Sequence, residues 1–170
     1  TPLYSSAASD VYKRQAPPIA LHELPALRGV VLSHDHYDHL DRATIRALAP
    51  RVDFFLCTLG VGDRLMDWGV APEKVRQFDW WQDVQVDGLR FTATPAQHFS
   101  GRGLRDGNRT LWASWVIEDL ASADTLRVFF SGDGGYFDGF AEIGRRFGHF
   151  DLTLMAVSYT HLRAHETPEH

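Results

Sequence analysis

Three histidines and three aspartates fall within eight residues, where residues 34–41 read HDHYDHLD. Imidazole and carboxylate groups together are typical ligands of zinc or a similar borderline cation. In an extended segment the side chains of residues i and i+2 point the same way, so His34 and His36 can bind one metal ion. Asp38 and His39 follow where the chain turns toward the next helix, and they can face a second ion. The alternative is a polar loop that only caps a helix, but so dense a set of ligand-type groups has no packing rationale.

Two more candidate ligands stand just after predicted strands. His98 follows the strand at 89–94, and Asp133 follows the strand at 125–131 within the sequence Gly-Asp-Gly. The flanking glycines allow the backbone to approach an ion closely. Taken alone, His98 is typical of a loop histidine and Asp133 of a turn residue. Beside the 34–41 cluster, both become candidate metal ligands.

The elements that position these residues follow from hydrophobic patterning and turn signals. Asp41 is predicted to cap a helix that Pro50 ends, and Asp87-Gly88 predicts a hairpin. We expect helices at 43–49, 63–68 and 140–147, and strands at 29–33, 52–57, 84–86, 89–94, 111–118, 125–131 and 150–156. This order predicts an α/β fold of sheet layers covered by helices. The histidine cluster directly follows the first strand, where active-site loops of α/β proteins tend to lie.

Length and composition narrow the class of protein. The chain has 170 residues, of which 44% are hydrophobic and 23% charged, which is typical of one soluble globular domain. The net charge of -5 argues against non-specific binding to nucleic acid. A single cysteine, Cys57, excludes an internal disulfide framework and a cysteine-built zinc ribbon.

Both ends of the chain carry an unusual signature. Residues 5–15 read SSAASDVYKRQ and residues 157–167 read VSYTHLRAHET, and both resemble translated arms of a transposase sequencing adaptor. We therefore expect residues 1–15 and 157–170 to be adaptor-derived, and residues 16–156 to be a partial hydrolase domain whose natural start and end are missing. His161 and His165 are accordingly excluded from the candidate ligands.

The order HxHxDH, then a lone histidine, then a Gly-Asp-Gly strand end resembles the metallo-β-lactamase superfamily. Within it, SHDHYDHLD, TPAQHFSGRGLRDGNRTLWASWVIE and FFSGDGGYFDGFAEIGRRFGHFDL resemble the N-acylphosphatidylethanolamine-hydrolysing phospholipase D branch and its bacterial relatives. The resemblance implies an αββα sandwich, here truncated at both ends, with a dinuclear zinc site.

The resemblance also implies a set of ligands and two departures from it. By this resemblance, one zinc would be held by His34, His36 and His98. The other would be held by Asp38 and His39, and Asp133 would bridge both. Members of the family carry a hydroxyl residue where this chain has Gly134. Their last ligand histidine, which binds the second zinc, would lie beyond Ala156 and is missing, as is an N-terminal strand region.

The expected chemistry is hydrolysis of a phosphodiester. Two zinc ions roughly 3.5–4 Å apart can share a hydroxide whose pKa is near 7, which attacks phosphorus. Asp38 and Asp133 are the candidate catalytic carboxylates, with Asp133 orienting the nucleophile. The expected substrate is a phospholipid or another small phosphodiester. Two alternatives stay open: the same fold could hydrolyse a lactone, thioester or other small ester, or this chain could be an inactive metal-binding fragment.

Three residues are candidates for contact with the substrate. Arg102 and Arg105 could meet a phosphate or an anionic membrane surface, although a solvated loop is an equal alternative. Trp81 could line an acyl-chain groove, although core packing is the more common role of such a residue. We expect no nucleic-acid partner, and either a cytoplasmic location or peripheral contact with a membrane.

Overall fold

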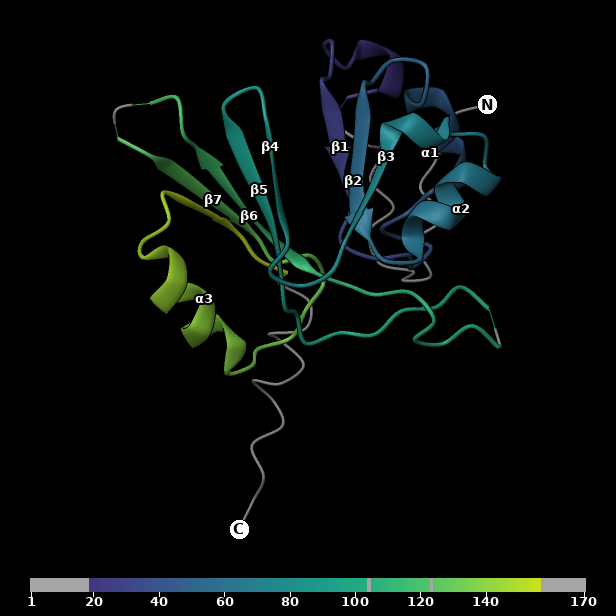
Figure 1. Cartoon of the computed structure of the whole chain (residues 1–170). Helices are drawn as coiled ribbons and strands as arrows, with labels where there is room; N and C mark the ends of the chain where they lie inside the picture. The colour runs from purple at the N-terminus through teal and green to yellow at the C-terminus, as the bar shows by residue number, and fades with distance from the viewer. Residues whose placement is uncertain (1–18, 104, 123, 157–170) are drawn as a thin grey trace. The chain divides into compact units, whose positions relative to one another are not determined.

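The computed structural model describes residues 19–103, 105–122 and 124–156 (Figure 1). The ends expected to be adaptor-derived, 1–15 and 157–170, lie outside these residues. The chain divides into two compact units, Thr1–Gln77 with Ser100–Leu111, and Phe78–Phe99 with Trp112–His170. Each unit has its own sheet and is described by itself.

The first unit contains a three-stranded sheet of order β1-β2-β3, in which β1 and β2 are parallel. Its elements are η1 (Leu21–Glu23), β1 (Gly29–Val31), α1 (Arg42–Leu48), β2 (Phe54–Thr58), α2 (Val61–Asp67), η2 (Pro72–Lys74) and β3 (Val75–Phe78). Phe55 and Cys57 alternate along β2, so their side chains share one face of the sheet. That face packs in one core cluster with Ile45 of α1 and Leu65 of α2, which means that both helices cover it.

Local sequence accounts for two features of this unit. Asp41 caps α1, as predicted, because its Oδ2 accepts a hydrogen bond of 2.7 Å from the backbone N–H of Thr44. Gly29 lies opposite Phe54, and a Cβ at position 29 would stand 2.1 Å from the Phe54 ring. A side chain at position 29 would therefore require the Phe54 ring to move.

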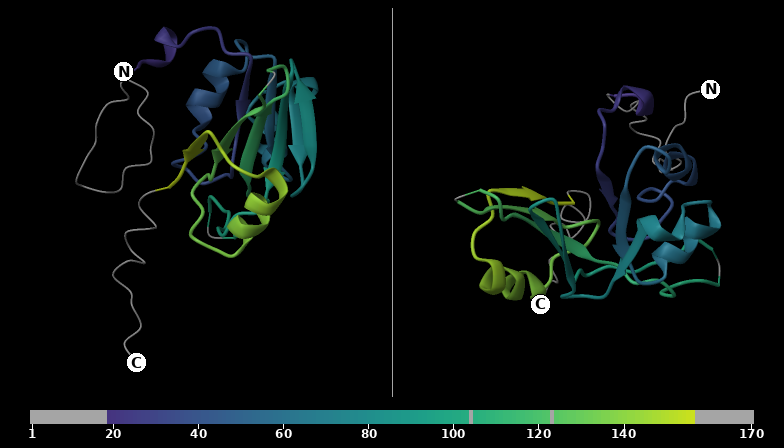
Figure 2. Two further views of the ribbon diagram at one scale, coloured as in Figure 1. Left: turned by 90° about the vertical axis from the view of Figure 1, so that its left-hand side faces the viewer. Right: turned by 45° about the horizontal axis from the view of Figure 1, so that its top comes forward.

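The second unit contains a five-stranded sheet of order β4-β5-β6-β7-β8. Its elements are β4 (Asp83–Val86), β5 (Leu89–Thr94), β6 (Ser114–Asp119), β7 (Leu126–Phe130), α3 (Gly139–Phe147) and β8 (Leu152–Leu154). The strands pair antiparallel except for β7 and β8, which are parallel. Ile143 of α3 packs on Val116 and Phe129, so that the helix lies along one face of the sheet (Figure 1, Figure 2). Asp87 and Gly88 both have positive φ, at 52° and 83°, which confirms the predicted hairpin turn.

The structure confirms the three predicted helices and corrects three strands. Strand β3 was not predicted, because its sequence VRQF offers little apolar signal. The strand expected at 111–118 begins only at Ser114, since the backbone of Leu111 hydrogen-bonds Leu59 in the first unit instead. The strand expected at 150–156 is confined to Leu152–Leu154. Among the described residues, no helix has both the length and the apolar character needed to cross a bilayer.

Candidate metal centre

The histidine cluster of the first unit forms what we call the ligand segment, residues 33–41. Within it, Nε2 of His34 lies 2.9 Å from Nδ1 of His36. Two nitrogens bound tetrahedrally to one zinc at usual bond lengths stand about 3.3 Å apart, so the pair is close to the spacing that a shared ion requires. The hydroxyl of Ser33 lies 2.9 Å from Nδ1 of His34, and this contact keeps the other ring nitrogen turned toward His36. The two side chains therefore fit a divalent metal.

A tight turn brings the rest of the ligand segment back toward these histidines. The backbone N–H groups of His39 and Leu40 both donate to the carbonyl of His36, at 3.1 and 2.9 Å. The ring of His39 consequently lies 4.5 Å from that of His34, measured between centroids. Oδ2 of Asp38 is 3.4 Å from Nε2 of His39 and half-exposed. The turn predicted at Asp38 and His39 is present, and it gathers three imidazoles and a carboxylate from six residues.

In the second unit, His98 and Asp133 approach each other at one edge of the sheet. Strands β5 and β7 both pair antiparallel with β6, so they run in the same direction and end at the same edge. A backbone hydrogen bond of 2.9 Å from Gly135 to Gln97 ties the two following loops together. As a result, Nε2 of His98 lies 3.9 Å from Oδ2 of Asp133.

Two glycines shape the Asp133 loop. Gly132 has a φ of +63°, a conformation that side chains disfavour, and this turn follows directly on β7. Gly134 replaces the hydroxyl residue that the family resemblance implies. A Cβ at position 134 would meet the Cβ of Ala96 at 3.4 Å, which is an ordinary contact. The backbone there thus has room for a small side chain that this sequence does not supply.

Three charged residues, Asp35, Arg64 and Asp106, form an ion chain that begins within the ligand segment and that the sequence did not predict. Asp35 is fully buried; its Oδ1 accepts the backbone N–H of Gly101 at 2.8 Å, and its Oδ2 pairs with Nε of Arg64 at 2.8 Å. Nη2 of Arg64 also binds Oδ2 of Asp106 at 2.7 Å. The hydrogen bond from Arg64 lowers the pKa of Asp106 to about 2, helped by backbone N–H donors at Gly103 and Arg102. Burial alone would lower the pKa of Arg64, but Asp106 and Asp35 outweigh this effect and raise the pKa above its ordinary value. The only sequence signal was the position of Asp35 between two histidines.

The three candidate substrate contacts have different surroundings. Nη1 of Arg102 donates to three carbonyls of the ligand segment, and burial lowers the pKa of this guanidinium below its usual range. Arg105 is exposed on the same loop. Trp81 packs against the core under α3, with the guanidinium of Arg146 3.9 Å from its ring centroid. Arg102 thus has backbone partners that the sequence did not indicate, whereas Trp81 takes the core-packing role that was the more common alternative.

Comparison with known proteins settles the family. The model of the β-lactamase superfamily domain matches residues 5–169. The chain belongs to the β-lactamase superfamily. This finding, together with the two sheets and their helices, confirms the fold class that the resemblance implied.

The chain resembles both uncharacterised proteins and a named phospholipase D. An uncharacterised protein of Mycobacterium tuberculosis is 47% identical over 146 residues, which is 83% of this chain and 37% of that protein. An N-acyl-phosphatidylethanolamine-hydrolysing phospholipase D of Caenorhabditis elegans is 33% identical over 152 residues, covering 83% of this chain and 41% of that protein. Among solved structures, the metallo-β-lactamase fold protein YhfI of Bacillus subtilis matches with a TM-score of 0.55 and 20% identity, over 78% of this chain and 51% of that one. The chain therefore spans about two fifths of the length of these two curated relatives.

The donor set agrees with the superfamily. Its fold implies a divalent metal, and histidine and aspartate side chains of the described residues offer the ligand atoms such an ion needs. Imidazole and carboxylate are also the groups that borderline divalent cations prefer.

Proposed function

We propose that this β-lactamase superfamily domain is a zinc-dependent hydrolase of the N-acylphosphatidylethanolamine phospholipase D type, which cleaves a phosphodiester. The observation that carries the proposal is the 2.9 Å approach of His34 Nε2 to His36 Nδ1 within a metal-ligand motif. The Caenorhabditis elegans relative, which is an N-acyl-phosphatidylethanolamine-hydrolysing phospholipase D, supports the choice of substrate. The substrate proposed here is accordingly a phospholipid.

In this proposal the assignment of ligands follows the family resemblance. His34 and His36 would hold the first ion together with His98, and Asp38 and His39 would hold the second. Asp133 would be shared between them. The contact between Ser33 and His34 supports the first assignment, because metal-bound imidazoles usually hold a partner on their other ring nitrogen.

The chemistry divides between the metal and the chain. When bound, a pair of divalent metals supplies a hydroxide nucleophile at neutral pH and offsets charge on the phosphoryl oxygens. The carboxylates of Asp133 and Asp38 would help to hold that centre, and Asp133 would orient the nucleophile. The neutral imidazoles add no negative charge, so the centre stays cationic and favours an anionic diester. Arg105 is exposed and can contact a phosphate or an anionic membrane surface. We therefore propose that the protein makes peripheral contact with a membrane.

A substrate panel tests the proposal. The 170-residue chain is incubated with N-acylphosphatidylethanolamine in mixed micelles, with bis(p-nitrophenyl) phosphate, with a γ-lactone and with a thioester. Each reaction is run with added zinc, after removal of metal by a chelator, and after zinc is restored. Phosphatidylethanolamine without the N-acyl group is the matched control for substrate recognition.

We expect zinc-dependent release of phosphatidic acid from the N-acylated lipid, and slower cleavage of the unacylated control. Cleavage of the lactone or thioester in place of both diesters would contradict the phosphodiesterase assignment and leave the metallohydrolase fold in place. Diester cleavage that persists in the metal-free protein would contradict the proposal altogether.

A further inference from the structure

The main chain of the ligand segment is held by a single side chain from a distant part of the same unit. Nη1 of Arg102 donates to the carbonyl oxygens of Asp35 at 2.8 Å, His36 at 3.3 Å and Leu40 at 2.6 Å. These carbonyls bracket the turn that carries Asp38 and His39. One guanidinium thus holds both ends of the turn from which Asp38 and His39 project.

The Asp35–Arg64–Asp106 ion chain holds the same segment through Asp35. One oxygen of the buried Asp35 carboxylate accepts a hydrogen bond from Gly101 N–H, and the other forms an ion pair with Nε of Arg64 at 2.8 Å. Asp35 lies between His34 and His36 in sequence, so fixing it also fixes the backbone from which both imidazoles extend. Asp106 closes the network by accepting the backbone N–H groups of Arg102 and Gly103 at 3.0 and 2.7 Å.

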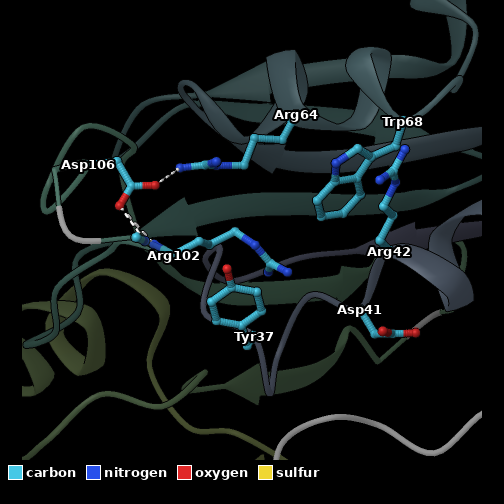
Figure 3. A pocket seen from close by; sticks show the side chains of 8 residues that line it. Tyr37, Asp41, Arg42, Arg64, Trp68, Arg102 and Asp106 are labelled. Carbon is cyan, nitrogen blue, oxygen red and sulfur yellow. Dashed lines mark hydrogen bonds and ion pairs between the residues drawn. The ribbon is translucent and has the colours of Figure 1, made fainter.

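The guanidinium of Arg102 is held in place by two aromatic rings. Its central carbon lies 4.0 Å from the ring centroid of Tyr37 and 5.1 Å from that of Trp68. These side chains line a hollow of about 540 Å³. In Figure 3, Arg64 reaches toward Asp106, and Asp106 toward the backbone of Arg102. Arg64 and Arg102 direct hydrogen bonds to protein acceptors, so we read them as part of the wall of the hollow and not as a free anion site.

We infer that Arg102 is a positioning residue for the metal centre, acting through the carbonyls of the ligand segment, and that the Asp35–Arg64–Asp106 chain supports it. This inference rests on the proposed metallohydrolase function. Charge-assisted hydrogen bonds at partly buried sites are stronger than neutral ones, and each orients its acceptor. Outer partners of metal ligands typically change metal affinity by about 10–100-fold when they are lost. Arg102 acts one step further out, on the backbone that carries the ligands.

The test is metal binding by variants of the full 170-residue chain. Arg102→Met keeps an unbranched side chain beside Tyr37 and Trp68 but has no donor, and Arg102→Lys restores a charge with three N–H donors. Arg109→Met, at an exposed position on the same loop, is the matched control. Each metal-free protein is checked by circular dichroism and thermal unfolding, then titrated with Co²⁺ while the d–d absorption bands are recorded.

We expect Arg102→Met to weaken Co²⁺ affinity by about 10–100-fold and to alter the absorption bands, with the metal-free fold intact. Arg102→Lys is expected to recover part of the affinity, and Arg109→Met to match the parent. If Arg102→Met does not fold, Asp106→Asn, which loosens the same network from a partly exposed position, is expected to show the smaller loss of affinity and the same spectral change.

Parent affinity and parent bands in a folded Arg102→Met or Asp106→Asn protein would overturn the inference. An equal loss in Arg109→Met would also overturn it, because a general charge effect would then explain the result. A folded parent that binds no Co²⁺ is a different outcome, since it refutes the proposed metal centre itself.

Discussion

The two groups of candidate ligands are built in contrasting ways. The ligand segment of the first unit takes four ligands from six consecutive residues, and Arg102 and Arg64 hold its backbone and its buried Asp35. In the second unit, His98 and Asp133 are 35 positions apart in sequence and meet only because β5 and β7 end at the same edge of one sheet. The first group depends on a local network of charges, and the second on strand register. Metal affinity and fold stability should therefore respond differently to changes in the two groups.

The largest effect is expected from the ligand segment. His36→Ala removes one of the two converging imidazoles, and we expect the proposed diesterase activity to fall by more than about 100-fold, beyond the usual loss for outer partners. Activity is measured with bis(p-nitrophenyl) phosphate at saturating zinc. His22→Ala, at an exposed position in η1, is the control and should keep the parent rate. Turnover that is unchanged in His36→Ala would refute the site.

A ligand change in the second unit sharpens the contrast. Asp133→Ala is expected to abolish turnover and to weaken the first equivalent of zinc without removing it, because the imidazoles of the ligand segment stay in place. Equilibrium dialysis followed by metal analysis measures the retained zinc. Complete loss of zinc in a folded Asp133→Ala protein would show that the first unit does not hold an ion by its own ligands.

Backbone geometry should matter more in the Asp133 loop than in the neighbouring helix. Gly132→Ala places a side chain at a φ of +63°, and we expect it to lower the free energy of unfolding by about 1 kcal/mol. Gly144→Ala lies inside α3, where nothing stands within 4 Å of the new Cβ. It should raise the free energy of unfolding by about 0.5–1 kcal/mol. Urea denaturation of both variants checks the pair. Equal effects would mean that the turn at Gly132 is not strained.

The smallest effect concerns pH. Bonding to Arg64 lowers the pKa of Asp106 from 3.8 to about 2, so the charged form is favoured in the folded state. Its contribution to stability is then present above about pH 4 and is lost as the pH falls through 2. The difference in unfolding free energy between the parent and Asp106→Asn should shrink over this range. A difference that grows as the pH falls would contradict the assignment.

Much of this arrangement could be predicted from the sequence, because the information lies in short stretches. Only a few neighbouring residues determine the HDHYDHLD cluster, the helix cap at Asp41 and the hairpin at Asp87-Gly88. The roles of Asp35 and Arg102 could not be predicted in the same way. They depend on a contact between residues more than 60 positions apart, and an arginine in a charged loop is compatible with solvent, phosphate or a carbonyl oxygen.

The central claim is that the ligand segment binds metal through its two converging imidazoles. The most direct measurement is zinc per chain in the folded parent and in His34→Ala/His36→Ala, by equilibrium dialysis and elemental analysis. We expect one or two zinc ions per parent chain and a clear loss in the double variant, with the same circular dichroism spectrum. A folded parent without zinc, or equal zinc in both proteins, would contradict the claim.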